Sequence, residues 1–205
     1  MAQRDNGVSQ GMEPAEGIRG LIFDLDGTLI DSLEMNWQAM RKGFAHHGIT
    51  IDRDEFVLLT GRSLEEIVEI LLDRHYGPHD AEMAADIVRR KREEANSHIN
   101  DVKPIEVVAD VARRNYGRLK MAVGTGSDRH RAVRMLEATG LLELFDAIVS
   151  ADEVEKHKPA PDTFVRCAEL MGVDVESCQV YEDGEQGLAA ARACGMLWTD
   201  VRKYI

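Results

Sequence analysis

Cysteine is scarce in this chain of 205 residues, which contains three: Cys167, Cys178 and Cys194. An odd number with no C-x-x-C pair argues against a disulfide framework or a cysteine zinc site, and favours reduced thiols in a cytoplasmic protein. Long apolar runs are missing too, since no stretch approaches the roughly 18 residues of a membrane-spanning helix. Residues 1–17 are polar and Gly-rich and carry no secretory or transit signal, so we expect a disordered tail there.

Positive charge is also in short supply. The chain has 25 Lys and Arg against 37 Asp and Glu, a formal net charge of -12, and its pI is near 5.0. Nucleic acids and anionic membranes are themselves negative, so neither is expected as a partner. Any phosphorylated ligand must be held by local positive charge or by a metal ion, and we expect a small-molecule substrate and a monomer.

Short apolar runs alternate with amphipathic stretches along most of the chain. The expected strands are residues 20–24, 118–124, 146–149, 178–182 and 196–200. The expected helices between the later strands are residues 104–115, 129–139, 160–171 and 184–194. Strands and helices in alternation predict an α/β fold, in which a parallel sheet is covered by helices on both faces.

The interval from about residue 33 to residue 102 breaks this alternation. It contains four helical patterns and no convincing strand, with glycines at 48, 61 and 77 where helices would end or turn. The run RRKREE at 89–94 mixes charges and is typical of a solvated helix face. A separate helical lobe inserted after the first strand is the simplest interpretation.

Polar side chains gather where the predicted strands end. They are Asp24 and Asp26 after the first strand, Thr125, Gly126 and Ser127 after the second, and Glu182 and Asp183 after the fourth. Ligands of open parallel sheets bind beyond these carboxyl ends, so the three segments should converge on one crevice. Two carboxylates about 4 Å apart repel by roughly 4 kcal/mol at an effective dielectric of 20, which predicts a cation between them.

Oxygen is the donor atom that this set offers, and a hard ion such as Mg²⁺ prefers oxygen. A magnesium site beside an exposed Asp suits phosphoryl transfer, in which one carboxylate attacks phosphorus and a second moves the proton. Lys158, in the segment HKPAP, is the candidate cation for the transferring oxygens, because Pro159 and Pro161 restrict the backbone around it.

Four short motifs in this order resemble those of the haloacid dehalogenase superfamily. They are D-x-D-G-T at 24–28, the apolar strand ending in Thr125, Lys158 before a proline, and E-D-x-x-x-G at 182–187. The resemblance covers residues 18–201 and implies a Rossmann-like, three-layer core of strand order 5-4-1-2-3 with an inserted helical cap. We therefore expect the core at 18–34 and 103–205 and the cap at 35–102.

The resemblance also implies a role for each motif residue. Asp24 would be the nucleophile and a metal ligand, and Asp26 the acid/base, with its backbone carbonyl on Mg²⁺. Thr125 and Lys158 would hold the phosphoryl oxygens. Glu182 and Asp183 would complete the metal site, although Glu182 could instead support another ligand without touching the ion.

Other interpretations of these residues stay open. Asp24 and Asp26 could cap a turn, since Asp before Gly often does. Thr125 could be an ordinary strand-end hydroxyl, and Lys158 a solvated surface lysine. The scaffold could also belong to a non-catalytic, phosphate-binding regulatory protein.

Within the superfamily, the segments at 121–127, 157–173 and 191–202 are most similar to the sugar-phosphatase branch that includes fructose-1-phosphate phosphatases. The branch also contains β-phosphoglucomutases, in which a cap His and a cap Arg handle a second phosphate. Those places hold Asn36 and Leu64 here, which favours hydrolysis of a small phosphorylated sugar or sugar acid over a mutase reaction. Arg62 could still supply the missing charge.

Substrate choice should lie in the cap. We expect the loop of Gly61, Arg62 and Ser63 to contact the substrate, together with Asn36 from the cap and with Gly126 and Ser127 from the core. Ser63 followed by Glu66 is also a capping-box pattern, so this loop should start a helix as well.

Overall fold

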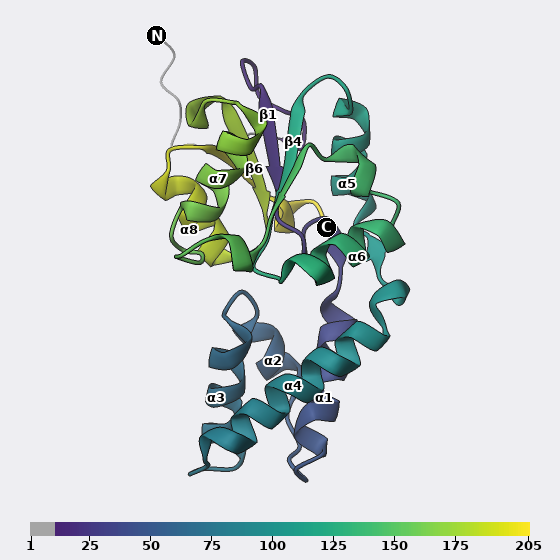
Figure 1. The fold of residues 1–205 in the computed structure, drawn as a ribbon, viewed down its shortest axis with the longest axis vertical. Coiled ribbons are helices and arrows are strands. Elements are labelled where there is room, and N and C mark those ends of the chain that lie inside the picture. The colour runs from purple at the N-terminus through teal and green to yellow at the C-terminus, as the bar shows by residue number, and fades with distance from the viewer. Residues whose placement is uncertain (1–10) are drawn as a thin grey trace. The chain divides into compact units, whose positions relative to one another are not determined.

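The structure is a computed structural model that describes residues 11–205. The chain forms two compact units. The first combines the residues up to Asp31 with Lys103–Ile205, and the second is Ser32–Val102. Figure 1 shows the fold with its main helices and strands labelled.

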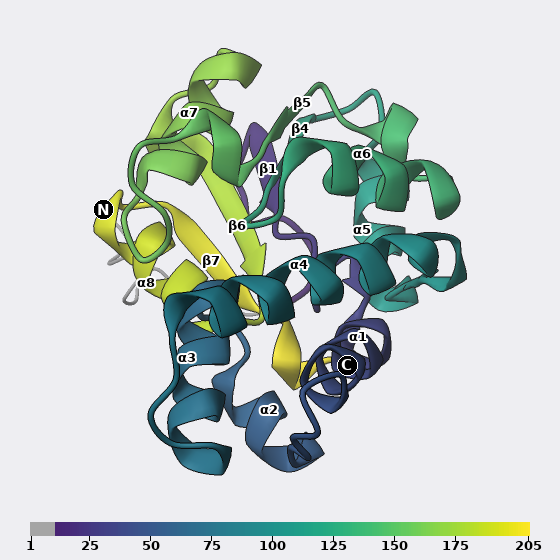
Figure 2. The same cartoon turned by 60° about the horizontal axis from the view of Figure 1, so that its bottom comes forward.

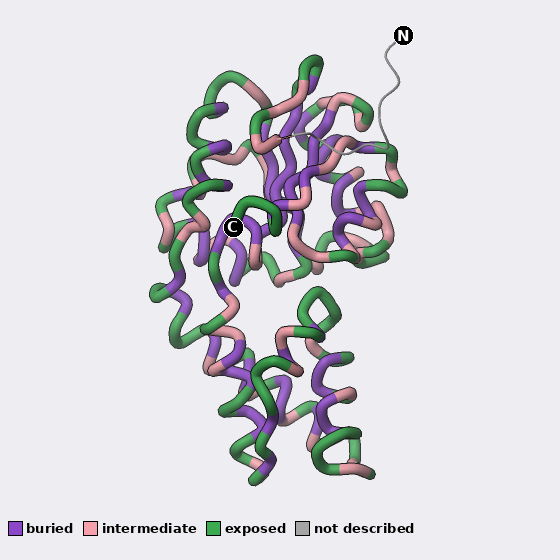
Figure 3. Tube along the Cα trace, turned by 180° about the vertical axis from the view of Figure 1, so that it is seen from behind, coloured by how far each residue is buried: buried purple, intermediate pink, exposed green. Residues whose placement is uncertain are grey.

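A five-stranded parallel sheet forms the centre of the first unit (Figure 1). Its strands are β1 (Gly20–Phe23), β4 (Lys120–Gly124), β5 (Ala147–Val149), β6 (Cys178–Glu182) and β7 (Leu197–Asp200). Their order, β5-β4-β1-β6-β7, confirms the expected α/β core. Phe23 is in register with Val123 on one side and with Tyr181 on the other, so β1 is central. It is buried along its whole length (Figure 3), as its unbroken apolar run predicts.

Four helices cover the two faces of this sheet. They are α5 (Glu106–Asn115), α6 (Arg129–Ala138), α7 (Asp162–Met171) and α8 (Glu185–Ala193). Figure 2 shows α5 and α6 on one side of the sheet and α7 and α8 on the other. The α7 side chains of Phe164 and Cys167 pack with Ile22 and Ala122 from the sheet in a buried cluster. This packing fixes the strand ends from which the candidate site is built.

A second, very short sheet was not predicted. β2 (Ile30–Asp31) and β3 (Lys103–Pro104) pair antiparallel, with Ile30 opposite Pro104. Two-residue strands are too short to show a period-two pattern in the sequence. The connections also contain short 3₁₀ helices, at Ile99–Asp101, Leu142–Leu144, Ala151–Glu153, Val175–Ser177 and Val201–Lys203.

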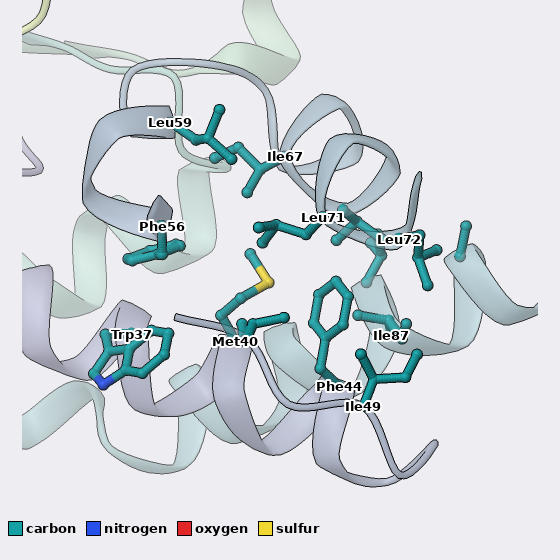
Figure 4. Close-up of a cluster of buried hydrophobic side chains, with 14 residues drawn as sticks. Trp37, Met40, Phe44, Ile49, Phe56, Leu59, Ile67, Leu71, Leu72 and Ile87 are labelled. Atoms are coloured by element: carbon teal, nitrogen blue, oxygen red, sulfur yellow. The ribbon is translucent and has the colours of Figure 1, made fainter. Parts of the chain in front are cut away.

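The second unit consists of four helices around its own apolar core. They are α1 (Leu33–Ala45), α2 (Arg53–Leu59), α3 (Leu64–His75) and α4 (Ala81–Ser97). Trp37, Met40 and Phe44 from α1 point toward the side chains of the other helices (Figure 4). Each fully buried side chain of this kind contributes about 1.5–3 kcal/mol of transfer free energy. Asp52, Ser63 and Asp80 side chains cap the helices that follow them.

The expected disordered tail at 1–17 lies partly outside the described residues, which begin at Gly11. From there the chain is held against the core. The Tyr181 hydroxyl donates to the Met12 carbonyl at 2.8 Å, and the Ala15 N–H donates to Gln179 Oε1 at 2.9 Å. These partners come from β6, which residue types at 11–17 could not reveal. Within residues 11–205, no helix has the length and apolarity needed to cross a bilayer.

Candidate active site

Lys158 joins two carboxylates at the carboxyl end of the sheet. Its ammonium lies 2.7 Å from Asp24 Oδ1 and 2.7 Å from Glu182 Oε2. Asp24 follows β1 and is 7% exposed, and its backbone N–H donates to the Tyr181 carbonyl, which extends the β1–β6 ladder by one residue. The Asp24 N–H is therefore paired as the chain leaves the sheet. Lys158 packs over the Phe164 ring with a side chain that is 12% exposed, so it is not a solvated surface lysine.

Glu182 is fixed from three directions. Its Oε1 accepts the backbone N–H groups of Asp183 at 3.1 Å and Gly184 at 2.8 Å, while Oε2 accepts from Lys158. A Cβ atom at Gly187 would lie 1.8 Å from Glu182 Oε2. The E-D-x-x-x-G motif therefore needs a glycine at 187, because any side chain there would displace the Glu182 carboxylate.

Asp183 is held by the first motif. The Thr28 hydroxyl donates to Asp183 Oδ1 at 2.7 Å. Gly27 has a φ of +87°, and a Cβ atom on it would lie 2.5 Å from Asp183 Oδ2. Gly27 therefore serves both the turn after Asp26 and the close approach of Asp183. The motifs at 24–28 and 182–187, far apart in sequence, therefore pack closely against each other.

Asp26 contacts a different group of residues. The Ser127 hydroxyl donates to Asp26 Oδ2 at 2.7 Å, and the Arg131 guanidinium lies 3.3 Å from Asp26 Oδ1. Reasoning from the sequence missed Arg131. No helix-face pattern could have found it, because Ser127 lies before α6 and the Asp26 partner is 105 positions away in the chain.

Thr125 is placed at the end of β4 and is buried. Its N–H donates to the Val149 carbonyl at 2.9 Å, and its hydroxyl accepts the Ser127 N–H at 3.0 Å. Gly126 is exposed, and a Cβ atom there would meet nothing within 4 Å. The segment 125–127 therefore presents backbone and hydroxyl groups beside Asp26, and its role toward a phosphate stays a prediction.

Burial dominates the electrostatics of the acidic residues. It raises the pKa of Asp24 to about 7, with the neighbouring Glu182 charge adding to the effect. Burial also raises the pKa of Asp183 to about 6, helped by Asp24, and raises the pKa of Glu182. Burial opposes the charged form of Lys158, but its pKa is raised because Asp24 and Glu182 stabilise the ammonium.

Asp24, Glu182 and Asp183 could hold a metal ion together. Each offers a carboxylate oxygen, and these oxygens lie within 4.8 Å of one another. It is the one such cluster within residues 11–205. Two buried carboxylates and the half-buried Asp183 carboxylate beside a single ammonium favour a further cation, and the all-oxygen donor set fits a hard divalent ion. The predicted contact of the Asp26 backbone carbonyl with the metal is not tested by this geometry.

The second unit carries the remaining predicted substrate residues. Asn36 donates from Nδ2 to Ser32 Oγ at 3.2 Å and accepts at Oδ1 from the Lys91 ammonium at 2.7 Å. Lys91 lies in the run 89–94, expected to be solvated, yet it is 7% exposed. The mixed charges of this run did not predict the burial of Lys91, because burial of one lysine within a charged run depends on the helix packed against it.

Gly61, Arg62 and Ser63 form an exposed loop between α2 and α3. Gly61 has a φ of +90°, a conformation that favours glycine. Ser63 and Glu66 make the predicted capping box, with Ser63 Oγ accepting the Glu66 N–H at 3.2 Å and Glu66 Oε2 accepting the Ser63 N–H at 3.1 Å. The loop's contact with substrate stays a prediction.

Comparison with known proteins gives one consistent result. A family model described as haloacid dehalogenase-like hydrolase matches residues 21–201. Fructose-1-phosphate phosphatase YqaB from Escherichia coli is 41% identical over 188 residues, which cover 91% of this chain and 98% of that protein. Beta-phosphoglucomutase from Bacillus subtilis is 27% identical and is matched over 87% of this chain and 81% of its own length.

A solved structure with the same fold is CbbY from Rhodobacter sphaeroides, crystallised in complex with phosphate. It superposes with a TM-score of 0.77 at 27% identity, covering 88% of this chain and 84% of that one. The fold, the four motifs and the sequence relatives therefore point to the same family.

Proposed function

Because the chain belongs to the haloacid dehalogenase-like hydrolase family, we propose that it is a Mg²⁺-dependent phosphatase that hydrolyses a small phosphorylated sugar or sugar acid through an aspartyl-phosphate. The observation that carries the proposal is the buried Asp24 carboxylate, held by Lys158 beside Glu182 and Asp183. A carboxylate fixed at the end of a strand, with a cation at one of its oxygens, is arranged to attack phosphorus.

In the first step, an Asp24 carboxylate oxygen forms a bond to phosphorus as the bond from phosphorus to the sugar oxygen breaks. Asp26 gives its proton to the departing oxygen, which leaves as an alcohol. In the second step, Asp26 takes a proton from a water molecule as that water attacks phosphorus. Inorganic phosphate leaves, and the Asp24 carboxylate is restored.

Positive charge must balance the oxygens of the transferring phosphoryl group. Lys158 supplies one such charge, since its ammonium already lies against Asp24. Asp24, Glu182 and Asp183 would hold Mg²⁺, which when bound supplies further charge neutralisation for those oxygens. The Thr125 hydroxyl and the Gly126 N–H would add hydrogen bonds to the phosphoryl group.

We assign substrate selection to the second unit, in which residues 35–102 would form the cap. Asn36 and the loop of Gly61, Arg62 and Ser63 are its candidate contact residues, and Gly126 and Ser127 are those of the core at 18–34 and 103–205. The similarity to a fructose-1-phosphate phosphatase makes ketose and aldose phosphates the first substrates to test.

A phosphosugar mutase is the second candidate, because a β-phosphoglucomutase is among the relatives. Asn36 stands where the mutases of this branch carry a histidine, and its amide is occupied with Ser32 and Lys91. An amide cannot take the charge that a histidine would offer to a second phosphate, so hydrolysis is favoured.

Phosphate release from a panel of sugar phosphates, including fructose 1-phosphate, tests the proposal. The Asp24→Asn variant should be inactive with Mg²⁺ present, whereas Asp174→Asn should retain activity because Asp174 is an exposed partner of Arg19. Interconversion of glucose 1-phosphate and glucose 6-phosphate without phosphate release would indicate a mutase. Silence of the wild-type protein across the panel would favour a non-catalytic binding protein.

A further inference from the structure

Both oxygens of the Asp26 carboxylate bind donors from one short segment, residues 127–131. Ser127 lies just before α6 and donates to Oδ2 at 2.7 Å, while Arg131 in the first turn of α6 reaches Oδ1 at 3.3 Å. Each carboxylate oxygen therefore has its own donor. Asp26 contributes no carboxylate oxygen to the acidic cluster, which is made by Asp24, Glu182 and Asp183.

The Arg131–Asp26 contact is unlike the surface ion pairs of this protein. The Arg131 side chain is 9% exposed and that of Asp26 is 27% exposed. On the same helix, the Arg129 side chain pairs with Glu153 while 52% exposed, where solvent weakens the attraction. A buried guanidinium loses most of its hydration, and the Asp26 carboxylate beside it offsets that cost.

The start of α6 fixes where both donors stand. The Asp128 side chain accepts the Arg131 N–H at 2.9 Å and so caps the helix. Thr125 anchors the residues just before α6. Its N–H donates to the Val149 carbonyl, and its hydroxyl accepts the Ser127 N–H. The β4–α6 connection thus fixes the positions of Ser127 and Arg131, and these positions allow both side chains to contact Asp26.

We propose that Arg131 is a positioning residue for Asp26, holding with Ser127 the carboxylate that carries the proton to the leaving group; this rests on the phosphatase function proposed above. A general acid works only when its oxygen meets the departing atom in a narrow geometry. Arg131 restrains the orientation of that carboxylate from the side opposite Ser127. It acts through Asp26 and does not itself touch the reacting atoms.

The leaving group provides the test. A sugar alkoxide needs a proton as it departs, whereas p-nitrophenolate leaves readily without one. The value of kcat/KM reports the steps up to departure of the alcohol or phenol, which isolates the proton transfer from the later hydrolysis. Arg131→Gln should lower kcat/KM about 10- to 100-fold for the sugar phosphate and less than about threefold for p-nitrophenyl phosphate. The first loss stays at or below the roughly 100-fold lower end of what a general acid contributes, because Asp26 itself remains.

The ratio of the two kcat/KM values within one variant does not depend on how much of that variant is folded. Arg131→Lys keeps the positive charge, so it should have a higher sugar-phosphate kcat/KM than Arg131→Gln. This variant also allows the test if Arg131→Gln folds poorly. Arg129→Gln on the same helix is the matched control and should keep the wild-type ratio.

A double-mutant cycle completes the test. In the Asp26→Asn background, Arg131→Gln should change sugar-phosphate kcat/KM less than about twofold, because its effect passes through the carboxyl already removed. The role of Arg131 would be overturned if Arg131→Gln lowered sugar-phosphate kcat/KM by the same factor in the Asp26→Asn background as in the wild-type protein. Equal losses of kcat/KM on the two substrates in Arg131→Gln would also overturn it. Failure of the wild-type protein to release phosphate from either substrate would instead overturn the proposed function.

Discussion

The Lys158 ammonium lies 2.7 Å from the Asp24 carboxylate, although the two residues are 134 positions apart in the chain. The contact joins the strand end after β1 to the loop before α7. It also places a permanent cation at the proposed nucleophile, where charge accumulates during phosphoryl transfer.

Replacing Lys158 should affect activity and folding together. In Lys158→Met, Asp24 and Glu182 both lose their buried partner, and breaking such a pair typically costs about 3–5 kcal/mol of unfolding free energy. We expect a loss of kcat/KM for phosphate release of about 100-fold or more, the scale seen when a charge-stabilising group is removed from an active site. Urea unfolding and phosphate-release kinetics would measure the two effects.

Lys156 offers the control for that substitution, because it lies two residues away and is exposed. Lys156→Met should change neither stability nor activity appreciably. Equal behaviour of the two variants would contradict the assigned role of Lys158.

The glycine of the last motif should tolerate no side chain. In Gly187→Ala the new methyl group would meet Glu182 Oε2 at 1.8 Å, so the carboxylate or the helix must move. Overpacking of this kind typically costs about 1–3 kcal/mol. We also expect weaker Mg²⁺ binding, since Glu182 belongs to the acidic cluster, and titration calorimetry would detect it. Unchanged Mg²⁺ affinity would show that Glu182 supports its neighbours without holding the ion.

The acidic cluster predicts an unusual pH dependence of stability in the metal-free protein. Burial raises the folded-state pKa of Asp24 from 3.8 to about 7 and that of Asp183 from 3.8 to about 6. The folded state then binds more protons than the unfolded state between about pH 4 and pH 7, so stability falls as pH rises through this window. With a chelator present, the Tm should drop by several degrees from pH 5 to pH 7.5.

Asp24→Asn is the comparison that isolates this effect. His79 also has a raised pKa, through its bonds to Gly77 and Glu69, and its contribution is likewise lost as pH rises. The fall in Tm should therefore be shallower in Asp24→Asn, with the remainder due to other groups. Mg²⁺ should raise the wild-type Tm most at pH 7.5, where the carboxylates are ionised. Parallel Tm curves for the two proteins would contradict the assignment.

The sheet and the motif residues could be predicted because their signals are local. A buried strand such as β1 has an unbroken apolar run, and Asp24 and Asp26 follow it directly. The contacts of the motifs then follow from strand order, since parallel strands end at one edge.

Buried charges outside the motifs could not be predicted in the same way. Arg131 and Lys91 each lie in a helix rich in charged residues, and their partners are 105 and 55 positions away. Their burial depends on those distant partners, which helix periodicity does not reveal. The same reason applies to Met12 and Ala15, whose partners lie on β6.

Covalent capture of the phosphoryl group tests the central claim most directly. The Asp26→Asn variant, which lacks the base that activates water, should be mixed with Mg²⁺ and ³²P-labelled p-nitrophenyl phosphate, whose leaving group departs readily without a proton from Asp26, and then quenched in acid. We predict that label remains on the protein and maps to the peptide containing Asp24, and that none is retained when Asp24 is also replaced by Asn. Label on another residue, or wild-type hydrolysis with no labelled protein in any variant, would contradict Asp24 as the nucleophile.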